Sequence, residues 1–162
     1  TAAGQDDRAI SYLESERAKD PKNITIIQQL ATYYAKKDFD KALDAFQTVA
    51  KLSPTKEHWY TVGVVCWERS YKGGVMVPDE ERVKLIDLGQ EALNKALALD
   101  PDYFEALSYV NLLHREQAKV CANRQDRECY DKEMAAADAM VKRALDARKK
   151  KAAQPGTATT KS

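Results

Sequence analysis

The chain has few of the residues that interrupt helices or cross-link small proteins. Its 162 residues include only six glycines, five prolines and three cysteines. With so few turn residues, and without strict alternation of apolar and polar positions, β-strands and β-hairpins are not expected. Three cysteines are too few for a disulfide scaffold, and none forms the Cys-x-x-Cys spacing of a redox or zinc site. These absences favour a helical protein.

The sequence also lacks an excess of charge and a long apolar run. Lysine and arginine number 26 against 25 aspartates and glutamates, so the net charge is +1 and favours neither nucleic acid nor an anionic membrane. No apolar run approaches the roughly 18 residues needed to span a bilayer, and no signal peptide opens the chain. We therefore expect a soluble chain with no nucleic-acid partner and no membrane span. Because it begins with Thr1 rather than Met, we expect a processed chain or a fragment.

What the sequence does contain is a series of apolar-periodic segments that end at prolines. Hydrophobic residues make up 44% of the chain and charged residues 31%, as in a globular protein able to bury a core. Pro21, Pro54 and Pro101 each follow such a segment, where a ring that cannot continue a helix marks its end. The sequence predicts consecutive helices separated at these positions.

The same spacing of apolar and small residues recurs along the chain. One set is Trp59, Val62, Gly63 and Cys66, and the same slots in the preceding segment hold Ile27, Leu30, Ala31 and Tyr34. Second-helix slots hold Ala42, Phe46 and Pro54, then Gly89, Leu93, Ala96 and Pro101. A third segment offers Leu107, Val110 and Asn111, followed by Ala137, Val141 and Ala144. This pattern resembles the tetratricopeptide repeat (TPR), whose unit is about 34 residues long.

The resemblance implies an all-α, right-handed superhelical TPR solenoid of antiparallel helical hairpins. We expect a single domain over residues 1–150 and a disordered tail over 151–162. Within the domain we expect a partial repeat at 6–21 and repeats at about 22–54, 55–101 and 102–150. The second and third repeats are elongated: residues 72–77 are predicted to be a loop, and Pro78 with the acids after it predicts a strong helix start. Such elongation is similar to that of certain exported bacterial TPR proteins.

Small residues are predicted to allow the two helices of each unit to approach. Ala31 and Gly63 occupy these slots on first helices, and Ala42, Gly89 and Ala137 occupy them on second helices. A larger residue at Gly63 is expected to overpack the crossing.

By resemblance, the first helices line a concave groove that binds a peptide or a partner protein. The groove positions are Gln28, Thr32, Tyr60, Val64, Trp67, Leu112 and Arg115. TPR modules that hold a chaperone's terminal carboxylate use Lys, Asn and Arg on this strip. The same positions here hold Gln28, Thr32, Thr61, Glu105 and Tyr109. A chaperone co-factor that binds a terminal carboxylate is therefore not expected. The resemblance implies a non-catalytic scaffold with a protein or peptide partner.

Two interpretations of Trp67 remain open at this stage. A rigid aromatic side chain on a concave surface is typical of a binding hot spot. Alternatively, Trp67 packs against the extra length of its own second helix or against Val75, Met76 and Val77.

The cysteines also leave alternatives open. Cys66 occupies a buried slot, where it acts as a small apolar residue. Cys121 and Cys129 flank a predicted turn capped by Asp126 or Asn123, across which a disulfide is sterically feasible. A disulfide would imply an oxidising, extracytoplasmic compartment such as a periplasm, whereas two free thiols would fit the cytosol.

No set of residues predicts catalysis, a metal site or a cofactor. His58 and His114 lie on different helices with no cysteine or acid at ligand spacing, and no nucleophile, phosphate-loop or RNA-binding pattern is present. Two alternatives to a peptide-binding scaffold are an assembly or regulatory segment of a larger exported bacterial protein or complex, and a structural homo-oligomerisation module. Both are favoured by Ala9, Ile10 and Leu13, which lack a partner helix before them.

Overall fold

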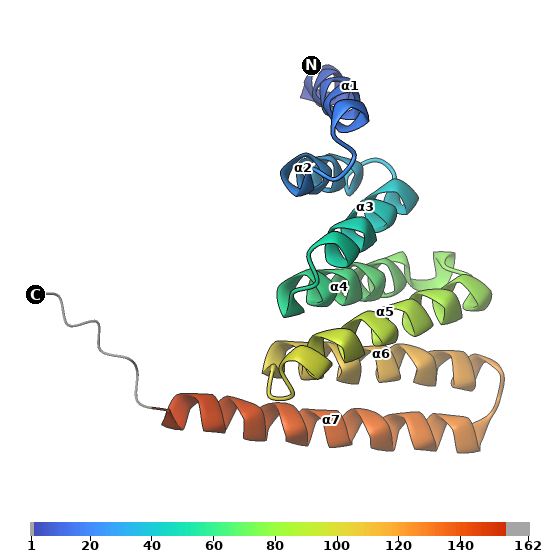
Figure 1. Ribbon diagram of the computed structural model, residues 1–162. Coiled ribbons are helices and arrows are strands. Elements are labelled where there is room, and N and C mark those ends of the chain that lie inside the picture. Colours follow the sequence, from blue (N-terminus) through green and yellow to red (C-terminus); the bar gives the residue numbers. More distant parts are fainter. Residues whose placement is uncertain (1, 155–162) are drawn as a thin grey trace, which may run out of the picture.

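The computed structural model describes residues 2–154, and in this range it is built from seven α-helices and one short 3-10 turn with no strand (Figure 1). The helices are α1 (Ala2–Lys19), α2 (Ile24–Tyr34), α3 (Phe39–Leu52), α4 (Lys56–Gly73), α5 (Asp79–Leu99), α6 (Phe104–Asn123) and α7 (Arg127–Ala153), and the 3-10 turn η1 (Gly74–Met76) lies between α4 and α5.

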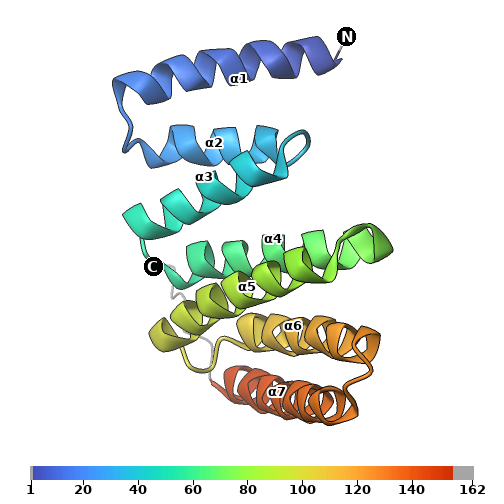
Figure 2. The same cartoon turned by 90° about the vertical axis from the view of Figure 1, so that its right-hand side faces the viewer.

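The helices stack in chain order as antiparallel hairpins. Figures 1 and 2 show α1 at one end of the stack and α7 at the other. The hairpins α2–α3, α4–α5 and α6–α7 follow α1 in chain order. The second and third hairpins are visibly longer than the first, as the sequence predicted. This arrangement confirms the all-α solenoid.

Polar residues before four of the helices determine where those helices begin. Asn23, Asp38, Thr55 and Asp126 each accept a hydrogen bond through the side chain from the backbone N–H three residues later. Such caps satisfy amide groups that have no partner within the helix. Asp126, rather than Asn123, is therefore the cap of α7. Among the helices without such a cap, α5 begins directly after Pro78 with three acidic residues in its first turn.

Glycines lie where the helices of the second hairpin cross and meet α6. A Cβ at Gly63 would lie 2.6 Å from Leu93 Cδ2, and one at Gly89 would lie 2.9 Å from Leu113 Cδ1 and 3.1 Å from Cys66 Cβ. Only a residue without a side chain fits at these separations. In the neighbouring hairpins Ala31, Ala42 and Ala137 are almost fully buried in the corresponding small-residue slots.

The segment expected to be a loop, residues 72–77, is largely ordered as helix. Lys72 and Gly73 complete α4, and η1 follows directly. The chain reverses at Gly74, whose φ of +50° is readily adopted only by glycine. Backbone carbonyls in this turn accept hydrogen bonds from the Arg82 side chain, which explains why the segment is structured.

The N-terminal end differs from the expectation of an unpartnered helix. The first helix begins at Ala2 and buries Leu13 in a cluster with Leu30, Tyr34 and Ala42. Leu13 is 7% exposed, so its side chain is covered by α2 and α3 without any preceding helix. Ile10 packs against the same cluster.

The C-terminal end differs in two respects. Val141 was expected in a packing slot but is 36% exposed, and Leu145 beside it is 51% exposed, because no described helix follows α7 to cover this side. In addition, α7 continues through Ala153, past the expected boundary at 151, and Lys151 lies over the Phe104 ring at 5.3 Å. Residues 155–162 of the expected tail lie outside the described residues.

Candidate functional site

Five aromatic rings form a continuous row between α4 and α6. In order along the row they are Tyr103, Tyr60, Tyr109, Trp67 and Tyr71, and we call them the aromatic row. Successive ring centroids are 5.3, 5.4, 5.4 and 4.9 Å apart. These separations are those of favourable stacked and edge-to-face contacts. The α4 members recur at helical spacing on one side of the helix, which is why they align.

The aromatic row belongs partly to the core and partly to the surface. Tyr60, Trp67, Tyr103 and Tyr109 are half-buried against the cluster that contains Ile86, Leu93 and Leu113. Tyr71, at the end of the row, is 56% exposed. A partner reaching this surface would meet rings that are already held in place by the core.

The contacts of Trp67 decide part of the question that its sequence context left open. The indole stacks on Tyr71 and meets the edge of Tyr109. Val75 and Met76 do not cover it, because they are 99% and 84% exposed. Trp67 is nevertheless half-buried against the cluster that contains Ile86 and Leu93 of α5, as the packing alternative expected, and its aromatic contacts are with its own helix and with α6.

A lysine lies over the ring at each end of the aromatic row. The Lys56 ammonium is 4.9 Å from the Tyr103 centroid, and that of Lys119 is 5.2 Å from the Tyr71 centroid. Both lysines also pair with a carboxylate: Lys56 with Asp100 at 2.5 Å, and Lys119 with Glu116. The hydrogen bond from Lys56 lowers the pKa of Asp100 and raises that of Lys56.

Near Tyr103 the aromatic row opens into a pocket of about 520 Å³ between the ends of four helices. Its charged lining residues are Lys56, Lys150 and Lys151 together with Glu57, Asp100, Asp102 and Glu105. Lys150 pairs with Asp102 at 3.3 Å. The Glu105 Oε2 atom is buried and accepts no hydrogen bond from the part of the chain that the structure describes.

The phenol of Tyr60 stays neutral at physiological pH. Burial, followed by the neighbouring Tyr109 and Tyr103, raises the pKa of Tyr60 to about 12, and the nearby Glu105 carboxylate contributes in the same direction. The row is therefore uncharged where it adjoins the pocket.

The other groove residues predicted from the sequence lie on three helices, α2, α4 and α6. Gln28 and Thr32, on α2, are exposed, and the Gln28 amide lies 3.2 Å from His58 Nε2. Val64 and Leu112 are half-buried. Arg115 donates to Asn111 at 2.9 Å and to Asp138 at 3.1 Å. The predicted groove residues are therefore polar on α2, apolar at Val64 and Leu112, and charged at Arg115, rather than one uniform strip.

Sequence reasoning missed the contributions of Tyr71, Tyr103 and Tyr109 to this surface. Neither Tyr71 nor Tyr103 occupied a groove slot of the repeat pattern, because Tyr71 follows the first-helix slots of the second repeat and Tyr103 precedes α6. Tyr109 was considered only because it stands at a position where carboxylate-binding TPR modules have Lys, Asn or Arg. The signal available was the helical spacing of Tyr60, Trp67 and Tyr71 on α4.

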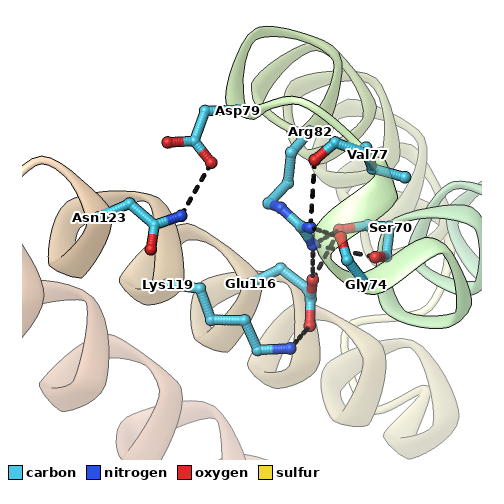
Figure 3. A network of polar contacts seen from close by, with 8 residues as sticks. All are labelled: Ser70, Gly74, Val77, Asp79, Arg82, Glu116, Lys119 and Asn123. Atoms are coloured by element: carbon cyan, nitrogen blue, oxygen red, sulfur yellow. Dashed lines mark hydrogen bonds and ion pairs between the residues drawn. The ribbon is translucent and has the colours of Figure 1, made fainter.

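A buried polar network holds the tip of the second hairpin against α6 (Figure 3). Arg82 Nη1 donates to Glu116 Oε2 at 2.6 Å and to both oxygens of Ser70 at 2.9 Å, and Ser70 Oγ donates to Glu116 Oε2 at 2.6 Å. Arg82 Nη2 donates to the carbonyls of Gly74 and Val77. The side chains of Arg82 and Glu116 are only 7% and 2% exposed.

The charges in this network remain compensated. Burial alone would raise the pKa of Glu116, but hydrogen bonds from Lys119 and Ser70 and the positive charges of Lys119 and Arg82 outweigh it and lower the pKa. Outside the network, Asn123 donates to Asp79 at 3.0 Å and adds a further link between α6 and α5. These contacts join α4 and α5 to α6, and the aromatic row lies between α4 and α6.

The two C-terminal cysteines lie together across the α6–α7 turn. The Cα atoms of Cys121 and Cys129 are 5.6 Å apart and the side chains are paired as a disulfide. Cys66 is buried and unpaired, and burial raises the pKa of its thiol to about 12, so it has no thiolate character at neutral pH.

The histidines, the possible metal ligands and the hydrophobicity of the helices indicate no further site over residues 2–154. His58 Nδ1 lies 2.6 Å from the Ser53 carbonyl, and His114 lies 2.7 Å from Glu133. Over residues 2–154 no group of His, Cys, Asp or Glu is arranged to hold a metal ion. In the same range no helix combines the length and apolar character needed to cross a membrane.

Comparison with known proteins relates the chain to solved TPR structures. No family model and no curated protein matches the sequence. The solved structure of "MamA MSR-1 C2" is similar with a TM-score of 0.50 and 20% identity, over 88% of this chain and 71% of that one. YrrB, described as a TPR protein with an unusual peptide-binding site, has a TM-score of 0.36 and 16% identity over 91% of this chain and 86% of its own. Together with the stacked hairpins and the small residues at their crossings, the MamA similarity confirms that the chain has the TPR solenoid fold.

Proposed function

We propose that the chain is a non-catalytic interaction module that binds an extended segment of a partner protein along the aromatic row. The observation that carries this proposal is the partly exposed row of five rings between α4 and α6. Rigid aromatic side chains supply large contact area at small entropic cost, and they dominate the affinity of many protein interfaces.

The packing of the aromatic row supports this proposal. Its inner edges lie in the core, so the rings need not be ordered when a partner binds, which reduces the entropic cost of association. The Tyr71 ring stacks on Trp67 and lies under Lys119, yet it is 56% exposed, so part of its surface remains open to a partner. Val64 and Leu112, which are half-buried, add apolar surface beside the row.

A selection from a phage-displayed random peptide library, with the chain immobilised, tests the proposal. We expect enriched peptides whose affinity for Tyr71→Ala falls by about tenfold or more, as for a hot-spot residue. Tyr12→Ala is the matched control, because Tyr12 is 65% exposed and lies on α1, away from the row. Failure to enrich any peptide, or equal losses in the two variants, would contradict the proposal.

A second candidate function is homo-oligomerisation through the open end of the solenoid. The observation in its favour is the exposure of Val141 and Leu145 on α7, because a solenoid end that exposes apolar residues can pair with another copy. Light scattering should then show a dimer that Val141→Lys converts to a monomer. A monomeric wild-type chain at high concentration would rule this candidate out. The alternative of an assembly segment within a larger exported protein stays a prediction from the sequence.

A further inference from the structure

We infer that the Tyr60–Tyr103 end of the aromatic row recognises a cationic side chain, arginine or lysine, in the partner segment. This inference rests on the proposed function and specifies the chemistry of the partner. It starts from the charges around this end of the row, which are not all compensated within the protein.

The lysines that line the pocket beside Tyr103 already have partners. Lys56 is bound to Asp100, and Lys150 to Asp102. Lys151 lies over the Phe104 ring at 5.3 Å. A negatively charged ligand would have to displace one of these contacts.

Two carboxylates in the same pocket have no such compensation. Neither Glu57 nor Glu105 forms an ion pair or accepts a side-chain hydrogen bond from the residues that the structure describes. Both carboxylates are close enough to influence the Tyr103 phenol electrostatically. The pocket thus places these two carboxylates beside the Tyr103 ring, and negative charge next to an aromatic ring is the chemistry that holds ammonium and guanidinium groups.

The carboxylate of Glu105 is the strongest indication that this pocket binds a cation. Over residues 2–154, only two buried side-chain nitrogen or oxygen atoms make no hydrogen bond, Arg82 Nε and Glu105 Oε2. A buried carboxylate oxygen without a donor is unfavourable, and a donor supplied by a ligand would relieve that cost. Arginine offers several N–H donors in a planar fork and can stack on a tyrosine at the same time.

The protein itself shows that this surface accommodates a cation. Lys56 lies 4.9 Å from the centroid of the Tyr103 ring. Tyr60 is next to Tyr103 at a centroid distance of 5.3 Å, and among residues 2–154 no lysine or arginine lies over its ring. A partner cation that enters the pocket beside Tyr103 would therefore meet the two glutamates next to Lys56, with Tyr60 as the next ring of the row.

A simpler explanation is that these glutamates only complement the dipoles of their helices. Glu57, Glu105 and Glu128 are each the second residue of a helix, and an acid there is stabilising in any case. Glu128, however, is exposed and lies at the opposite end of the α6–α7 hairpin from Glu105. The burial of Glu105 Oε2 and the adjacent rings are not explained by the dipole.

The test uses the peptides enriched from the random phage library on the immobilised chain. We expect them to contain a required arginine or lysine. A synthetic peptide in which that arginine is replaced by citrulline, its neutral isostere, should bind at least tenfold more weakly. Glu105→Gln should weaken the arginine peptide by a similar factor and leave the citrulline peptide unaffected, whereas Glu128→Gln should change neither. Circular dichroism of each variant checks that it is folded.

Each other outcome contradicts a defined part of this reasoning. Enriched peptides without a basic residue, or with a required acidic residue, that still depend on Tyr71 would overturn the cationic site and leave the proposed function intact. Equal losses in Glu105→Gln and Glu128→Gln would assign the effect to the helix dipole and also overturn it. Failure to enrich any peptide would contradict the proposed function itself, and the cationic site with it.

Discussion

At the scale of single residues, Gly63 shows how tightly the second hairpin is packed. A Cβ at this position would lie 2.6 Å from Leu93 Cδ2, so any side chain must displace a fully buried leucine. We expect Gly63→Leu to destabilise the fold by roughly 1–3 kcal/mol and to lower the Tm measured by circular dichroism.

Ala98→Leu is the control for this substitution. Ala98 lies on α5, in the same hairpin, but its side chain is exposed, so the larger residue meets no neighbour there. Its Tm should stay close to that of the wild-type chain. A Gly63→Leu variant that melts at the wild-type temperature would show that the crossing of α4 and α5 is looser than described.

At the scale of elements, Arg82 and Glu116 join the tip of the second hairpin to α6. Removing one partner leaves an uncompensated buried charge, so we expect Arg82→Met to destabilise the protein by about 3–5 kcal/mol in denaturant unfolding. The double variant Arg82→Met with Glu116→Leu should be more stable than Arg82→Met alone. A double variant as unstable as the sum of the two single variants would mean that the two side chains act independently.

The same pair makes stability depend on pH. The pKa of Glu116 is below its ordinary value of 4.5 in the folded protein, so its stabilising contribution is present above pH 4.5. This contribution is lost as the pH falls through the lower folded-state pKa. We expect the free energy of unfolding to decrease over this acidic range less steeply in Glu116→Gln than in the wild-type chain. Identical pH profiles for the two proteins would contradict this role of Glu116.

The α6–α7 turn offers a second link between elements, through Cys121 and Cys129. If the two thiols are oxidised in solution, intact mass spectrometry should show two hydrogens fewer before reduction than after it. Reduction should also cost about 2–3 kcal/mol, the expected value for a short closed loop. A Cys121→Ser, Cys129→Ser variant controls for effects of the reductant elsewhere. Equal masses before and after reduction would contradict the disulfide.

The elements were largely predictable from the sequence, but the contacts between them were not. Helix ends follow from local signals such as Pro21, Pro54 and the Asp126 cap, which act within a few residues. In contrast, Arg82 and Glu116 are on different helices and each reads as an ordinary surface charge in the sequence. The repeat pattern placed Tyr60 and Trp67 on the groove side, but it carries no information about Tyr103, because that residue lies outside the repeat slots.

At the scale of the whole molecule, the solenoid should not be equally stable along its length. Each hairpin contacts only its neighbours, so stability is set locally. In α1 only Leu13 is buried among the side chains that the structure describes, whereas α6 buries eight residues. We expect amide hydrogen exchange to be fastest in α1 and slowest in α6. Uniform protection from α1 to α7 would instead indicate a single cooperative unit.

The turn between α4 and α5 has a consequence for resistance to proteases. Val75 and Met76 are the most exposed large apolar residues described, and they offer a cleavable segment to an endopeptidase with apolar specificity. Cleavage, however, requires an extended backbone, and Arg82 holds the carbonyls of Gly74 and Val77 on either side of these residues. The folded chain should therefore resist nicking at this accessible site, and loss of the Arg82 side chain should convert the tip of the hairpin into its first point of digestion.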